Sequence, residues 1–177
     1  MATEIEYEKT YLLKSIPDGI AKAKSVIIRD VLVPDTAYHP HLRLRNRGDD
    51  YMITKKCPVS GADSSVMYEY TIELEKEEFN ALTSCSTKDF VKTRYFMVLA
   101  GHPAEVDVYH GKLEGLAVVD FEFNSEAEKN AFETPDFVLA DVTQDESIAG
   151  GFLAGKSIDD IMPLIEKYGY KKLGSNL

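Results

Sequence analysis

The sequence predicts an α+β fold, an eight-stranded antiparallel β-barrel with short flanking helices. About eight strand-like segments follow one another, and the long helical crossovers that parallel sheets need are few. Charged residues of one sign also alternate along single strands, and a strand points successive side chains to opposite faces. Each charged set therefore lies on one face of its strand. A closed barrel with a charged interior explains this segregation, because a solvated sheet face usually mixes the two signs.

The charged sets recur from one end of the chain to the other. The acidic sets are Glu4, Glu6 and Glu8 in the first segment, and Asp120 with Glu122 in a later one. The basic sets are Arg43, Arg45 and Arg47, and Lys92 with Arg94. Divalent cations prefer carboxylate oxygen, and polyanions bind to arginine forks and lysine ammonium groups. Inside a barrel, the acidic sets would thus hold cations, and the basic sets would hold a polyanion.

In the first part of the chain, strands are expected at residues 3–14, 25–33, 41–47 and 51–55. The polar turn at 15–19 follows the first strand, and it could cap a short helix around residues 18–24. Pro34 and Pro40 separate the second strand from the third. The tight turn at 48–50 then joins the third and fourth strands as a hairpin.

In the second part, a loop at 58–65 leads to strands expected at 66–73, 90–99, 104–110, 116–123 and 137–143. Helices are expected at 75–84, 126–133 and 157–168. The first of these helices has Leu74, Phe79 and Leu82 on one side. The second begins with Ser125 and Glu128, which form a capping-box pattern.

Length and composition indicate one globular domain over residues 1–177, with 44% hydrophobic and 28% charged residues. The net charge of −10 argues against a nucleic-acid partner but permits a local basic pocket for a small anion. Cys57 and Cys85 are expected to be free thiols. No apolar run approaches the roughly 20 residues of a membrane span, and the N-terminus lacks the pattern of a signal peptide. A cytoplasmic location without membrane contact is therefore expected.

Six ordered blocks along nearly the whole chain resemble the motifs of the CYTH superfamily, the triphosphate tunnel metalloenzymes. The blocks are Glu4-Ile5-Glu6 with Lys9, Arg43-Leu44-Arg45, Ile53-Thr54-Lys55, Lys92-Thr93-Arg94-Tyr95, the stretch from Glu105 to Glu122, and Asp141-Val142-Thr143. Glu69 falls where the family has an acidic strand. A single Glu-x-Glu would carry no weight, whereas six blocks in the family's order are hard to obtain by chance.

The resemblance implies that the barrel binds a triphosphate-containing small molecule and hydrolyses it with Mg²⁺ or Mn²⁺, inorganic tripolyphosphate being the first choice of substrate. The residues that it assigns to the metal are Glu4, Glu6, Glu69, Asp120 and Glu122. Those that it assigns to the phosphates are Lys9, Arg43, Arg45, Lys55, Lys92 and Arg94. Lys92 is also the expected catalytic residue, because a pKa lowered by basic neighbours would let it orient or deprotonate the attacking water.

The chain departs from the family's pattern at several points. Glu8 stands where the family has lysine, and Lys9 comes one place later. In a regular strand Lys9 would face away from Glu4 and Glu6. Either a bulge turns Lys9 inward, or Glu8 takes its place and the local charge is more acidic. Met67 stands where many relatives have glutamate, and the tail beyond residue 143 diverges altogether.

Other functions stay open at this point. On the same fold, a class IV adenylate cyclase would use an internal ribose hydroxyl in place of water, and a thiamine triphosphatase would differ in substrate. A barrel that binds polyphosphate or nucleotide without turnover belongs to another class. The oligomeric state, monomer or homodimer, is also open.

A phosphate-binding P-loop is the remaining alternative, because residues 150–157 match G-x-x-x-x-G-K-S/T letter for letter. The polar residues 144–147 lie between the last expected strand and the first glycine, and only about twenty residues follow Ser157. That leaves no room for the later strand of such a domain. We therefore expect glycines that shape a loop, and a helix capped by Ser157 with Asp160 as its capping-box partner.

Overall fold

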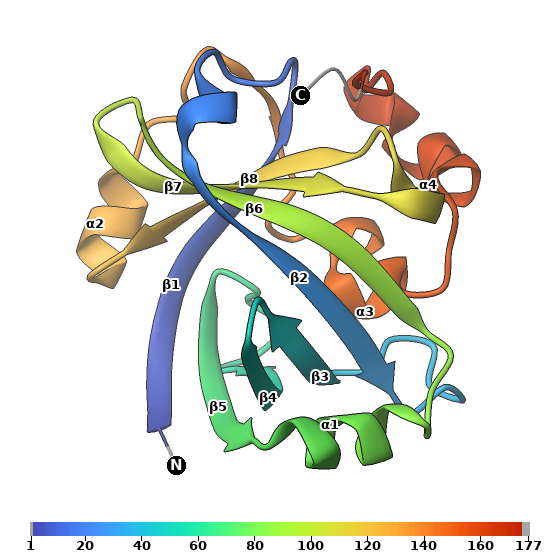
Figure 1. Cartoon of the computed structure of the whole chain (residues 1–177). Helices are drawn as coiled ribbons and strands as arrows, with labels where there is room; N and C mark the ends of the chain where they lie inside the picture. The colour runs from blue at the N-terminus through green and yellow to red at the C-terminus, as the bar shows by residue number, and fades with distance from the viewer. Residues whose placement is uncertain (1, 175–177) are drawn as a thin grey trace.

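A computed structural model describes residues 2–174, with side chains from residue 4 onward, and shows the predicted antiparallel barrel closed by eight strands (Figure 1). The strands are β1 (Ala2–Leu13), β2 (Lys24–Val33), β3 (Leu42–Arg47), β4 (Asp50–Pro58), β5 (Val66–Leu74), β6 (Asp89–Leu99), β7 (His102–Tyr109) and β8 (Ala117–Phe123). Their order in the sheet is β5-β4-β3-β2-β6-β7-β8-β1, and β1 pairs again with β5. A ninth strand, β9 (Val138–Asp141), pairs with β1 outside this circle.

β1 closes the barrel because it is long enough to pair with three other strands. Its residues 2–7 pair with β5, residues 7–12 with β8, and residues 11–13 with β9. The pairing with β8 runs without a shift in register through residues 7–12. Side chains of β1 therefore alternate strictly between the inside and the outside of the barrel along this stretch.

The helices lie outside the sheet or at its end. They are α1 (Lys76–Thr83), α2 (Glu126–Ala131), α3 (Gly150–Leu153) and α4 (Ile158–Ile165), with 3₁₀ turns at Ile20–Lys22, Gly111–Leu113, Glu146–Ile148 and Glu166–Tyr168. Helices were predicted at the positions of α1, α2 and α4, and these are confirmed. The helix expected around residues 18–24 is only a 3₁₀ turn, and α3 was not predicted because it begins with two glycines, which are poor helix formers.

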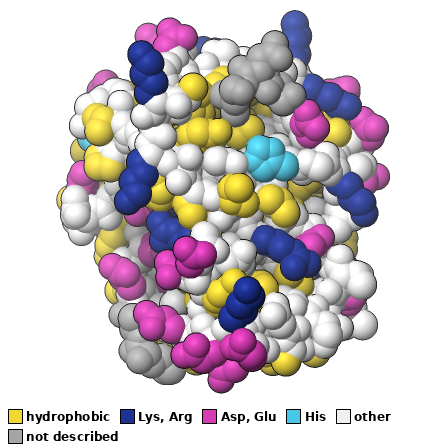
Figure 2. Space-filling model, viewed as in Figure 1, with side chains coloured by type: hydrophobic (Ala, Val, Ile, Leu, Met, Phe, Trp, Pro, Cys, Tyr) yellow, Lys and Arg dark blue, Asp and Glu magenta, His cyan; other side chains and the backbone are white. Residues whose placement is uncertain are grey.

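Two apolar layers cover the outside of the barrel wall. Under α1, Phe79 packs with Val31 and Leu44. On the other side, Tyr11 and Phe121 pack together with the aromatic residues that follow α2. Figure 2 shows that the outer surface carries charges of both signs, with acidic side chains gathered at the lower edge where α1 lies. None of the helices within residues 2–174 is long and apolar enough to cross a membrane.

α3 and α4 close one end of the barrel (Figure 1). At this end the inward positions of five strands are apolar, namely Leu12, Leu32, Phe90, Tyr109 and Val118. They form one buried cluster with residues of the two helices, namely Phe152, Leu153, Ile158 and Ile161. The charged part of the interior therefore ends on an apolar floor, and a molecule cannot pass through this end.

The P-loop alternative is wrong, because the glycine-rich segment forms α3 and contributes to the apolar floor. No strand runs into it, and α3 begins at Gly150, inside the motif. Gly151 lies so close to the 39–40 segment that an added Cβ would be 2.4 Å from the carbonyl oxygen of Pro40. Ser157 caps α4 in a capping box with Asp160, as predicted.

Candidate active site inside the barrel

Arginine and lysine side chains from two strands enter the barrel on either side of β2. Arg43 and Arg45 come from β3, and Lys92 and Arg94 come from β6, and both strands pair with β2. Each pair is separated by one residue, so alternation places both members on the inner face of the strand. The two basic rows predicted from the sequence thus lie on neighbouring parts of one wall.

Arg94 is the centre of an ionic cluster with three carboxylates. Its Nε lies 2.8 Å from Oδ1 of Asp107, and its Nη2 lies 2.7 Å from Oδ2 of the same carboxylate. Nη2 is also 3.2 Å from Oδ2 of Asp120, and Nη1 contacts Glu105. Three carboxylates around one buried guanidinium raise the pKa of Arg94 well above its ordinary value, although burial alone would lower it. The side chain is therefore a fixed cation at every pH of interest.

Lys92 is a buried lysine held next to Asp107. Its Nζ contacts Oδ2 of Asp107 and lies 5.8 Å from the ring centroid of Tyr109. Burial lowers the pKa of Lys92, and the charges of Arg94 and Arg45 lower it further, against the opposing effect of Asp107. A lysine with a lowered pKa is a candidate for a general base.

The acidic residues face one another across strands. In the register, Glu8 of β1 lies opposite Glu122 of β8, and Glu105 of β7 lies opposite Asp120. Like charges in such positions destabilise a sheet. Asp120 is buried, and burial together with the neighbouring carboxylates raises its pKa to about 8. Glu122 is more exposed, and its partial desolvation together with Glu105, Glu8 and Glu6 raises its pKa to about 7. This part of the barrel therefore holds more negative charge than its neighbours neutralise.

Lys56 connects this acidic region to Arg43. Its Nζ contacts Glu6, lies 3.4 Å from Oε2 of Glu8 and lies 3.6 Å from Oε2 of Glu69. Arg43 donates from Nη2 to Glu69 over 3.3 Å. Its Nε is buried and has no hydrogen-bond partner within residues 4–174. This N–H is an unused donor in the charged interior, so Arg43 can accept a further anionic ligand.

The interior carboxylates suit a hard divalent cation, because such ions prefer carboxylate oxygen as a ligand. A cation would also neutralise part of the excess negative charge in this region. Within the part of the chain that the structure describes, no three Asp, Glu, His or Cys side chains converge closely enough to form a metal cluster. Lys56 and Arg94 bind most of these carboxylates. A cation would have to compete with these ion pairs for its oxygen ligands.

Two lysines expected at the phosphates lie outside the barrel, and these expectations are corrected. Lys55 is exposed, and the next residue, Lys56, points inward instead. The phase of the β4 pleat decides this, because Thr54 is buried on the inner side and the side chains alternate. Lys9 also points outward, since β1 has no bulge at this position, and its Nζ lies 3.5 Å from the carbonyl oxygen of Phe132.

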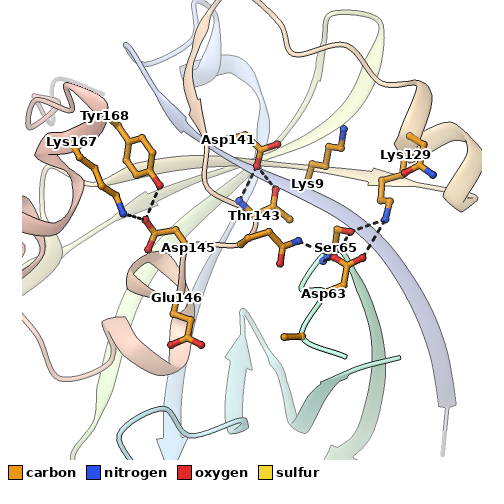
Figure 3. A pocket seen from close by; sticks show the side chains of 13 residues that line it. Lys9, Asp63, Ser65, Lys129, Asp141, Thr143, Asp145, Glu146, Lys167 and Tyr168 are labelled. Carbon is orange, nitrogen blue, oxygen red and sulfur yellow. Dashed lines mark hydrogen bonds and ion pairs between the residues drawn. The ribbon is translucent and has the colours of Figure 1, made fainter. Parts of the chain in front are cut away.

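Lys9 lines a separate open groove of about 960 Å³ on the outer wall, shown in Figure 3. Most polar groups there bond to one another. Lys129 donates to Ser65 over 2.7 Å, and Tyr168 donates to Asp145 over 2.8 Å. The first bond ties α2 to the residue before β5, and the second ties the C-terminal 3₁₀ turn to the segment that follows β9.

Of the eleven residues that the sequence singled out, the structure brings seven together in interior ion pairs, and two more lie exposed on the same strand faces. Glu6, Glu69, Arg43, Arg45, Lys92, Arg94 and Asp120 all take part in interior ion pairs. Glu4 lies opposite Glu69 in the register and is exposed, and Glu122 is exposed near the same carboxylates. Three other interior residues, Glu8, Glu105 and Asp107, belong to the charged set or the motif blocks seen in the sequence, but sequence analysis did not assign them to the metal or the phosphates. Asp30 and Lys56 were not singled out.

Comparison with known proteins gives one close curated relative. The inorganic triphosphatase of Nitrosomonas europaea is 32% identical over 151 residues, which cover 84% of this chain and 96% of that protein. A solved structure of an inorganic triphosphatase matches with a TM-score of 0.61 and 29% identity, over 84% of this chain and 93% of that one. A putative adenylate cyclase from Bacillus halodurans matches with a TM-score of 0.55 over 100% of this chain and 96% of its own, and at 14% identity it shows likeness of fold alone. No protein-family model matches the chain.

Proposed function

We propose a function from this premise: the chain belongs to the CYTH superfamily, the triphosphate tunnel metalloenzymes. Its proposed activity is hydrolysis of a triphosphate, with inorganic tripolyphosphate as the preferred substrate. One observation carries the proposal, namely five cations that enter a barrel whose far end is closed: Arg43, Arg45, Lys56, Lys92 and Arg94. A linear, highly charged and compact anion is the ligand that such a wall binds best.

In this proposal the cations bind the phosphate oxygens and align the chain, and the apolar floor limits how far it can enter. Water attacks the terminal phosphorus, the bond from that phosphorus to the bridging oxygen breaks, and pyrophosphate leaves. Lys92 orients the water or accepts its proton, and Asp107 holds the Lys92 amine in place. Arg94 stabilises the charge that spreads over the transferred group.

We further propose a divalent cation, Mg²⁺ or Mn²⁺, as the cofactor. Glu6, Glu8, Asp120 and Glu122 would hold it, with Glu4 and Glu69 beside them on β1 and β5. When bound, such an ion neutralises charge on phosphoryl oxygens. The pKa values of Asp120 and Glu122, raised by desolvation and by neighbouring carboxylates, support this assignment, because a cation bound between these carboxylates would stabilise their ionised forms.

The proposal treats residues 1–177 as one catalytic domain that acts in the cytoplasm. Cys57 and Cys85 are both free, which suits a reducing compartment.

Neighbouring lysines on β4 provide a matched test of the tunnel. Lys56→Ala is expected to raise the KM for tripolyphosphate at least about tenfold, because a charged hydrogen bond of about 1.5–3 kcal/mol is lost. Lys55→Ala removes the same charge from the outer surface, and it should change KM less than twofold. Initial rates at a series of substrate concentrations give both values. Equal effects of the two substitutions would show that the substrate does not bind inside the barrel.

A further inference from the structure

We propose that Asp30 is a positioning residue that holds the guanidinium of Arg45 in the orientation that hydrolysis requires. The inference rests on the proposed triphosphate hydrolysis. Asp30 lies on the inner face of β2, opposite Arg45 of β3 and Phe90 of β6. It thus stands between the two basic rows and at the edge of the apolar floor, opposite Phe90 and two residues before Leu32.

The contact between Asp30 and Arg45 fixes the plane of the Arg45 guanidinium. Nε of Arg45 lies 2.8 Å from Oδ1 of Asp30, and Nη2 lies 2.7 Å from Oδ2. Two parallel hydrogen bonds of this kind define the position and the tilt of a guanidinium. They use two of its five N–H groups, so the other three remain for another acceptor.

Asp30 is a fully buried charge in a basic environment. It is 0% exposed, and the side chain of Arg45 is 12% exposed. Arg45, Arg43 and Lys92 hold the pKa of Asp30 far below its usual range, against the effect of burial. The carboxylate is therefore ionised wherever the protein is folded, and the Asp30–Arg45 pair has no net charge.

Because the Asp30–Arg45 pair is neutral, it orients a phosphate group more than it attracts one. The three free N–H groups of Arg45 can hydrogen-bond to a phosphate, while the attraction of its charge is offset by Asp30. If Asp30 loses its charge, Arg45 gains attraction for any phosphate but loses its fixed plane. Ground-state binding should then stay the same or tighten, whereas the alignment of the transition state should suffer.

The test is the kinetics of Asp30→Asn with tripolyphosphate. We expect kcat to fall about tenfold or more, because a misplacement of about 1 Å can cost up to about 100-fold, and we expect KM to stay unchanged or fall. In an Arg45→Ala background, Asp30→Asn should lower kcat no further, because Asp30 acts through Arg45. Asp30→Glu, which keeps the charge but moves the carboxylate, should fold and also lower kcat.

The matched control is Asp89→Asn. Asp89 also accepts two hydrogen bonds from one arginine, Arg29, at 2.8 and 3.0 Å, although both are accepted by Oδ2. This pair lies on the exposed surface, so kcat and KM should not change. A kcat of Asp30→Asn equal to wild type, a higher KM at unchanged kcat, or a full additional loss in the Arg45→Ala background would each overturn the inference. A wild-type protein without turnover would overturn the proposed function, and this inference with it.

Discussion

Arg94→Gln is expected to lower kcat for tripolyphosphate by about 10³-fold, because it removes a preorganised cation from the transferring group. Arg94 contacts three interior carboxylates, and among the side chains of residues 4–174 it is the one that joins Asp107, Asp120 and Glu105. Phosphate release under saturating substrate measures the effect. A kcat within tenfold of wild type would show that Arg94 does not act on the reacting phosphate.

The same substitution should also destabilise the fold. Without Arg94, Asp107 and Asp120 are buried with fewer partners and repel each other. Removal of one partner from a buried ion pair costs about 3–5 kcal/mol, which corresponds to a fall in Tm of roughly 6–20 °C for a chain of this size. Calorimetry measures it, and activity must be assayed well below the new Tm. Arg29→Gln, which breaks an exposed pair with Asp89, should cost about 1 kcal/mol or less.

A second large effect is a loss of stability of the metal-free protein as the pH rises from about 5 to about 8. The pKa of Asp120 is raised from 3.8 to about 8, and that of Glu122 from 4.5 to about 7. A carboxyl with a raised pKa binds its proton more tightly in the folded state, so its contribution to stability is present at low pH and is lost as the pH rises through the folded pKa. Asp107, whose pKa is lowered to about 2, contributes in the opposite direction, but only below its unfolded pKa.

In the presence of EDTA, Tm should therefore fall between about pH 5 and pH 8. A difference of one pKa unit, about 1.4 kcal/mol, corresponds to about 3–5 °C. Mg²⁺ or Mn²⁺ should raise Tm more at pH 8 than at pH 5, because it binds the ionised carboxylates. Asp120→Asn should flatten the pH dependence and reduce the shift with metal. A Tm that is constant over this range in EDTA would mean that these carboxylates are not strained by one another.

Much of the barrel could be predicted because its alternation is visible in the sequence. The rows Arg43–Arg45 and Lys92–Arg94 lie inside, because charges two residues apart share a face of any strand. Lys55 and Lys56 could not be told apart in this way. They are adjacent, and only the phase of the pleat, set by the pairing of β4 with β3 and β5, decides which one points inward.

The closed end and the Asp30–Arg45 pair could not be predicted for related reasons. Leu12, Phe90 and Val118 look like ordinary core residues, and only the closure of the barrel shows that they face its interior. Asp30 is a single acidic residue in an apolar strand, without an alternating partner of its own sign. Its role depends on Arg45, which is fifteen residues away in the sequence and opposite in the sheet.

The most direct test of the central claim is the initial rate of phosphate release from tripolyphosphate by the intact protein, with Mg²⁺ or Mn²⁺ and then with excess EDTA. ATP and thiamine triphosphate serve as comparison substrates in the same assay. We expect phosphate and pyrophosphate from tripolyphosphate at the highest rate, and no product once EDTA is added. Cyclic AMP with pyrophosphate from ATP would assign the barrel to cyclisation. Tight binding of tripolyphosphate without any product would contradict hydrolysis and leave a barrel that only binds its ligand.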